Sequence, residues 1–151
     1  MLPKRLLFGV TLVFFTCPLV GRTQPASSPP REVELFGTQN QDGIKTDFVT
    51  TEAAVRNSPA WNPEGDDPPL SVARAIALAK AEFLSIHPKL DDAKLFSIQL
   101  MSIGAADVQD RWFYIIEFSP VLDGNTMFGS QAPIVLLMDG KAATARTTPR
   151  R

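Results

Sequence analysis

The sequence predicts an α+β fold in which one long helix packs on an antiparallel sheet of three to four strands, preceded by an extended N-terminal segment. Two patterns predict it. Apolar residues recur at helical spacing after Ser71, and from Leu95 onward they recur at every second position in short runs separated by turns. The chain has 151 residues, 44% of them hydrophobic and 21% charged, which suits a single globular domain.

Residues 1–21 have the pattern of a secretory signal peptide. Lys4 and Arg5 precede an uncharged apolar run over 6–15, and Pro18 then breaks the helix. A membrane-spanning helix needs about 20 apolar residues, which is more than this run offers. We therefore expect an exported protein, periplasmic or extracellular, with no membrane span after cleavage. The alternative is an uncleaved N-terminal anchor.

Cys17 is the single cysteine and lies at the end of this apolar run, where a lipoprotein cysteine would lie. Bacterial lipid-attachment sequences usually carry an aliphatic residue where this chain has Phe14, and Pro18 follows Cys17 directly. We therefore expect Cys17 to leave with the signal peptide, and lipid attachment is the minor alternative. A cysteine-free exported chain is stabilised by packing alone.

Residues 22–66 are predicted to form a tether followed by an extended segment. The stretch 22–31, RTQPASSPPR, is rich in proline and serine and is typical of a flexible tether. After it the sequence predicts a weak strand over 32–36, a returning strand over 44–50 and a short helical turn over 51–57 that Thr51 caps. The proline-rich stretch 58–70 admits no regular element.

The remaining residues, 67–151, are predicted to form the α+β domain. Ser71 is a good N-cap residue and Pro88 ends the helix. One helical face carries the apolar residues Val72, Ile76, Ala79, Phe83 and Ile86. Its many alanines raise helix propensity and allow a close approach to a sheet.

Four strands are predicted to follow the helix, over 95–103, 111–119, 133–138 and 141–146, with a loop over 120–132. Asp139 and Gly140 form a two-residue turn signal between the last two strands. Short links favour antiparallel neighbours. Both faces of the central strands are apolar, and one helix covers only one face. We expect the N-terminal segment to cover the other face, with a second copy or a partner as alternatives.

Three stretches resemble the PepSY-like and cystatin-like small exported domains of uncharacterised bacterial proteins. They are PPLSVARAIALAKAEF at 68–83, RWFYIIEF at 111–118 and PIVLLMDGKA at 133–142. The resemblance covers about the last 80 residues and implies an α+β domain that binds or inhibits rather than an enzyme. PepSY domains usually close with Asp-x-x-Thr-Gly, whereas here the turn is only Asp139-Gly140. No QxVxG-type stretch occurs, so no protease-binding loop is carried over from cystatins.

Composition argues against several chemistries. A formal charge of −1 disfavours a nucleic-acid partner, and one histidine with one cysteine disfavours a zinc site. His87 stands at the predicted helix C-terminus, where a cation is stabilised by the helix dipole. The pairs Asp66-Asp67 and Asp91-Asp92 lack the alternate spacing of a calcium loop. We therefore predict no catalytic residue, no cofactor and no metal.

Three residues form the candidate interaction surface: Trp61, Met127 and Phe128. Trp61 is either a platform on which a ligand stacks or, as we favour, an anchor that holds the proline-rich segment to the core. Met127 and Phe128 lie on a loop flanked by glycine and form either a contact site or a lid on the sheet. Glu117, within the most apolar strand, is a buried acid, the partner of a cross-strand cation such as Arg111, Lys94 or Lys141, or a residue near a sheet edge.

These observations lead to three hypotheses about function. The first is an exported, non-enzymatic binding or inhibitory module with an unidentified protein partner. The second is a structural or self-associating envelope protein, and the third is a hydrolase that depends on carboxylates alone. We expect a monomer or a weak homodimer.

Overall fold

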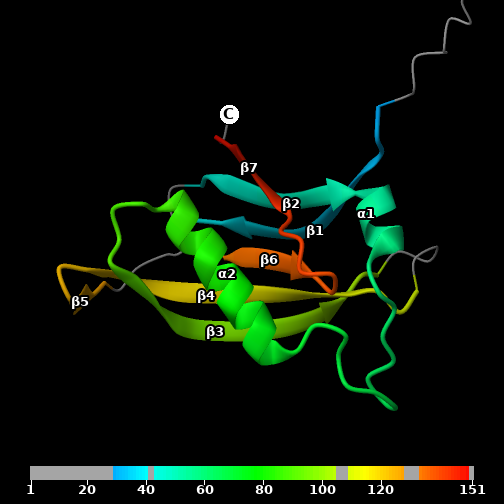
Figure 1. The fold of residues 1–151 in the computed structure, drawn as a ribbon. Coiled ribbons are helices and arrows are strands. Elements are labelled where there is room, and N and C mark those ends of the chain that lie inside the picture. The colour runs from blue at the N-terminus through cyan, green and yellow to red at the C-terminus, as the bar shows by residue number, and fades with distance from the viewer. Residues whose placement is uncertain (1–28, 41–42, 105–108, 128–132, 150–151) are drawn as a thin grey trace, which may run out of the picture.

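The computed structural model describes residues 29–40, 43–104, 109–127 and 133–149 (Figure 1). Its elements are, in chain order, β1 (Glu32–Gln39), β2 (Lys45–Thr51), α1 (Glu52–Asn57), α2 (Val72–Ile86), β3 (Asp92–Ser102), β4 (Trp112–Leu122), β5 (Asn125–Thr126), β6 (Ile134–Leu137) and β7 (Thr144–Thr148). Two antiparallel sheets and two helices make this a broadly α+β fold, as predicted. The prediction of one helix on one sheet is wrong, because the strands divide between two sheets. Within the described residues, no helix is long and apolar enough to cross a membrane.

The larger sheet is built around β4, which pairs with β3 along one edge and with β5 and β6 along the other. These pairs confirm the three predicted strands over 95–103, 111–119 and 133–138 to within a few residues. The loop predicted over 120–132 instead begins with a tight hairpin. Asp123 and Gly124 adopt φ of 49° and 73°, which turns β4 into β5 in two residues.

Helix α2 covers one face of this sheet and crosses its strands diagonally (Figure 1). The Ser71 hydroxyl accepts from the Arg74 amide, as its N-cap role predicts. The helix buries Ala75, Ala79 and Phe83 between itself and the sheet. The predicted apolar face is therefore partly wrong: the two terminal residues of α2, Val72 and Ile86, are 46% and 56% exposed.

A buried hydrogen bond lies in the core under α2. The Tyr114 hydroxyl, on β4, donates to the Leu70 carbonyl at 2.8 Å, and both residues are buried. This bond ties the proline-rich stretch to the sheet directly before α2 begins. Burial raises the pKa of the Tyr114 hydroxyl above its ordinary value.

The second sheet has the order β1-β2-β7 and covers the other face of the larger sheet. Phe48 of β2 and Val55 of α1 pack there against Phe113, Ile115 and Leu137. This confirms the expectation that the N-terminal segment covers the second face. It does so as two paired strands and a helix, and the Thr51 hydroxyl caps α1 by accepting from the Ala54 amide at 3.1 Å.

The C-terminal strand joins the two sheets. Residues 141–143 return beside β6 through a single bridge, between Leu136 and Ala142. From Thr144 onward the strand, now β7, pairs with β2 instead. The prediction that 141–146 would form a fourth strand of one sheet is therefore wrong. Its physical reason is that β6 is only four residues long, whereas β2 offers a longer edge that is free on that side.

Candidate functional site

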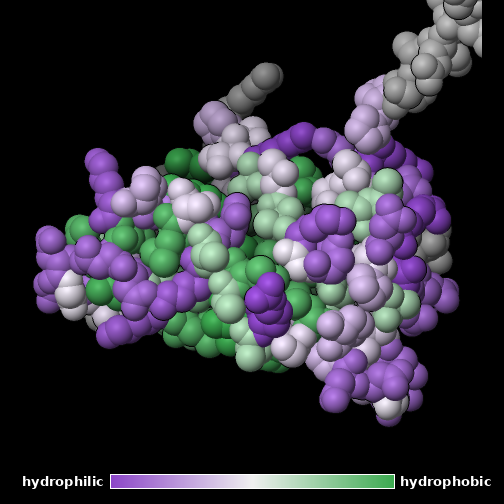
Figure 2. Space-filling model, in the orientation of Figure 1, coloured by the Kyte–Doolittle hydropathy of each residue, from purple (hydrophilic) through white to green (hydrophobic). Residues whose placement is uncertain are grey.

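A groove of about 450 Å³ opens where β6 and β7 separate. We call it the fork groove. One wall is the last part of α2, with Glu82 and Ile86, and the other is the start of β7, with Ala145. Pro133 and Ile134, at the start of β6, close its end. Figure 2 shows the face that carries α2, where apolar side chains gather along the helix and hydrophilic ones lie at both ends of the face.

The local sequence explains why the groove exists. Pro133 has no amide hydrogen and cannot continue the β6 ladder as a donor. The Ala143 amide donates to the Val135 carbonyl at 2.8 Å, and beyond this bond the strand turns toward β2. The side chains of Ala143 and Ala145 are small, so they leave open the space that larger residues would fill. The groove is the wedge between two diverging strands.

Two ionisable residues line this groove, Glu82 of α2 and His87, the residue that follows α2. Both are exposed. His87 is the C-cap residue of α2, and its amide donates to the Phe83 carbonyl at 3.1 Å. Its ring lies 4.7 Å from the Phe83 ring, measured between centroids. Neither Glu82 nor His87 has an ionic partner among the residues described, so both are available to a ligand.

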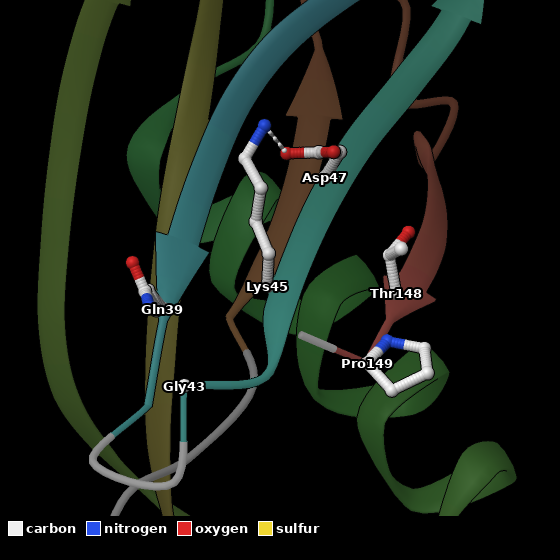
Figure 3. A pocket seen from close by; sticks show the side chains of 6 residues that line it. All are labelled: Gln39, Gly43, Lys45, Asp47, Thr148 and Pro149. Carbon is white, nitrogen blue, oxygen red and sulfur yellow. Dashed lines mark ion pairs between the residues drawn. The ribbon is translucent and has the colours of Figure 1, made fainter. Parts of the chain in front are cut away.

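A second, more open pocket of about 660 Å³ lies at the far end of the smaller sheet (Figure 3). Gln39, Gly43 and the C-terminal residues Thr148 and Pro149 line it together with an ion pair. Lys45 Nζ lies 2.7 Å from Asp47 Oδ1, and this hydrogen bond raises the pKa of Lys45. Because its two charges satisfy each other, this pocket offers a ligand less than the fork groove does.

Trp61 holds the proline-rich stretch to the start of β4. Its indole Nε1 donates to the Asp66 carbonyl at 2.8 Å, and its amide donates to the Asp110 carbonyl at 2.9 Å. Its ring packs edge-on against Trp112, with centroids 5.3 Å apart, and the Trp112 indole donates back to the Trp61 carbonyl. These four contacts are those of an anchor.

The other two residues of the candidate interaction surface lie elsewhere. Met127 is 46% exposed, and its amide donates to the Pro120 carbonyl at the end of β4. About 25 Å of strand separates it from Trp61, which lies at the start of β4. Phe128 lies outside the described residues. The structure thus does not bring Trp61 and Met127 together.

Glu117 has a neutral partner. The Ser97 hydroxyl, directly opposite on β3, donates to Glu117 Oε2 at 2.5 Å. Within the described residues Glu117 forms no ion pair with the three cations considered: Lys141 pairs with Asp139, Arg111 donates to the Arg56 carbonyl, and the charge of Lys94 acts on Asp92. The expectation of a cross-strand cation is therefore wrong, and a hydroxyl satisfies the half-buried carboxylate.

The sequence does not reveal the fork groove, because its lining comes from four separate elements and is mostly alanine and aliphatic residues. The signal available was the run Ala142-Ala143, two small residues directly after a turn, in a strand predicted to pack. Among the described residues, no three histidine, cysteine or acidic side chains come together to hold a metal. No protein-family model, curated protein or solved structure matches the chain.

Proposed function

We propose that the chain is a small exported binding or inhibitory module without catalytic activity, and that its ligand binds in the fork groove. The observation that carries the proposal is an open apolar groove beside which stand two polar side chains, Glu82 and His87, that form no ion pair with any described residue. Binding sites are typically concave and mostly apolar, with a few polar groups that orient the ligand. Export rests on the signal-peptide pattern of residues 1–21, and kinship with PepSY-like or cystatin-like domains rests on the helix and strands after residue 67.

A carboxylate-dependent hydrolase has less support. Such an enzyme needs two acids that face one cleft. The lining of the fork groove includes one carboxylate, that of Glu82, among the described residues. Glu117 is bound by Ser97 and belongs to the interior of a strand. A binding role needs no second acid.

The test is a fluorescence titration of the full chain with Nile red, an uncharged apolar dye. Ile86 and Val72 are both exposed apolar residues of α2, and only Ile86 lines the groove. Ile86→Gln should weaken dye binding roughly fivefold, the effect of about 1 kcal/mol of lost apolar contact. Val72→Gln, the matched control, should leave it unchanged. Equal effects of both substitutions, or no binding to the unchanged chain, would contradict a ligand site at the groove.

Self-association is the second candidate, and it rests on a different observation. Phe96 is 69% exposed on β3, an edge strand, and Leu95 and Met101 of the same strand are also exposed. A bulge between Leu95 and Ser97 places Phe96 outward as an extra residue. Exposed apolar residues on a strand edge favour pairing with a second chain. Sedimentation at micromolar concentration should then show a dimer that Phe96→Ser abolishes.

A further inference from the structure

The outer edge of β7 lies beside the fork groove and carries backbone groups that no described strand pairs with. β7 is the last strand in the order β1-β2-β7, so one of its edges pairs with β2. On the other edge, the last bond to a described residue is that of the Ala143 amide to β6. From Thr144 to Thr148 the outer edge of β7 therefore has no strand partner within the described part of the chain.

The ladder alternation fixes which groups this edge presents. The Ala143 amide points away from β2, because it donates to the Val135 carbonyl of β6. Backbone groups of successive strand residues point to alternate edges, and β7 pairs with β2 without a register shift. The amide and carbonyl groups of Ala145 and Thr147 therefore point to the free edge. They form a short template for one more strand.

The same geometry relates that template to the groove. Ala145 lines the groove, and residues directly opposite each other in neighbouring strands share one face of the sheet. A residue paired with Ala145 would therefore direct its side chain toward the groove and the end of α2. Residues two positions away in the added strand face the same side. One of them would lie toward Glu82, whose carboxylate has no ionic partner among the described residues.

We propose that the ligand of the fork groove is an extended peptide, which adds to β7 as an antiparallel strand. Its central aliphatic side chain enters the groove opposite Ala145, and a lysine or arginine two positions away lies against Glu82. The aliphatic choice follows from the lining, which includes Ile86, Ile134 and Val135. This inference rests on the proposed function and specifies its ligand class. Main-chain bonds give such a peptide affinity, and the groove and the carboxylate give it specificity.

The experiment is calorimetric titration of the full chain with the blocked peptide KVLVK. In this peptide both lysines face the same side as the central leucine. Two matched peptides serve as controls: EVLVE reverses the charge, and KVLVK with an N-methylated leucine cannot donate the central backbone bond. We expect binding of KVLVK, with each control peptide weaker by roughly tenfold or more.

Three substitutions test the same contacts from the protein side. Thr147→Pro removes an amide hydrogen that points to the free edge of β7. It should therefore weaken the binding of KVLVK and leave the far-ultraviolet circular dichroism spectrum of the chain unchanged. Glu82→Gln should weaken KVLVK, whereas Glu64→Gln, in the exposed proline-rich stretch, should not. Ile86→Gln should weaken both the peptide and Nile red.

The outcomes separate this inference from the proposed function. If Nile red binds in a way that depends on Ile86 but no peptide binds, the groove is still a ligand site, and the proposal that its ligand is a peptide is overturned. Equal binding of the methylated and unmethylated peptides would overturn strand addition. Binding of KVLVK only by displacement of a second copy of the chain would make that copy the occupant and overturn the proposal. Loss of KVLVK binding in Thr147→Pro and Glu82→Gln, with Glu64→Gln unaffected, supports it.

Discussion

The Ala143 amide donates to the Val135 carbonyl at 2.8 Å, and one residue later the chain belongs to the other sheet. This one bond marks the place where the C-terminal strand leaves β6 for β2. It closes the two sheets over a shared core, and it also creates the groove and the free edge of β7. The proposed site is thus a consequence of how the two sheets are joined.

Phe83→Ala should destabilise the fold strongly. The side chain is 1% exposed, and its ring lies 5.5 Å from that of Phe118 between α2 and the larger sheet. Truncation of a buried phenylalanine leaves a cavity and costs about 3–5 kcal/mol of unfolding free energy. Urea denaturation measures the change. Val72→Ala on the same helix, at an exposed position, should change the value by less than about 0.5 kcal/mol. Similar losses at both positions would contradict the packing of α2 described above.

Because the chain has a single tyrosine, the raised pKa of Tyr114 can be tested by measuring tyrosinate absorbance at alkaline pH. Burial raises the pKa of Tyr114 in the folded chain, so the folded state holds its proton more tightly than the unfolded state does. This stabilisation is fully present below the ordinary tyrosine pKa of 10.0 and is lost as pH rises above it. Titration at the tyrosinate absorbance band should show a midpoint above 10.0 in the folded chain and a lower midpoint in urea. Coincident midpoints would contradict the burial of this hydroxyl.

Tyr114→Phe supplies the control for that titration. It removes the only phenol in the chain and the bond to the Leu70 carbonyl. The unfolding free energy at neutral pH should fall by about 1 kcal/mol. The tyrosine contribution to the alkaline loss of stability should disappear as well.

Ser97→Ala should lower the free energy of unfolding by more than the loss of an exposed hydroxyl normally does. The half-buried Glu117 carboxylate would lose the hydroxyl that donates to it, and an unsatisfied group of this kind costs about 1–3 kcal/mol. A double-mutant cycle with Glu117→Gln measures the coupling, which should be at least about 0.5 kcal/mol. Additive effects of the two substitutions would show that the contact contributes nothing.

The secondary structure of the second half followed from local patterns. Ser71 began the helix as predicted because capping depends on one side chain and the amides within three residues of it. The β4 strand was predicted because alternating aromatic and β-branched residues suit a pleated surface. The helix face was predicted less well. Ala79 and Phe83 of the predicted face are buried, together with Ala75, which the prediction left out, whereas Val72 and Ile86 are exposed. Which residues at the ends of the helix contact the sheet depends on where the sheet lies, and the helix sequence alone does not state this.

The division of strands between two sheets could not be predicted. The turn at Asp139 and Gly140 was identified, and a return beside β6 follows from it. Which edge the strand then follows depends on β2, almost a hundred residues earlier in the chain. The fork groove exists only because the strand changes partner, so the candidate site could not be predicted from the sequence either. Trp61 was accessible to sequence reasoning because one indole in a proline-rich stretch has few other roles.

Gly140→Ala tests the turn after β6, which leads the chain back beside β6 before β7 begins. Gly140 has φ of +84°, and a Cβ atom there would lie 2.9 Å from Leu78 Cδ1. Both the left-handed backbone and the contact oppose a side chain, so the unfolding free energy should fall by about 1–2 kcal/mol or more. Gly104→Ala is the matched control, because its Cβ would meet nothing within 4 Å and its backbone is not left-handed. That control should be neutral or stabilising by about 0.4–1 kcal/mol, since alanine restricts the unfolded chain. If both substitutions had the same effect in urea denaturation, the turn would not constrain the strand, and the fork would need another cause.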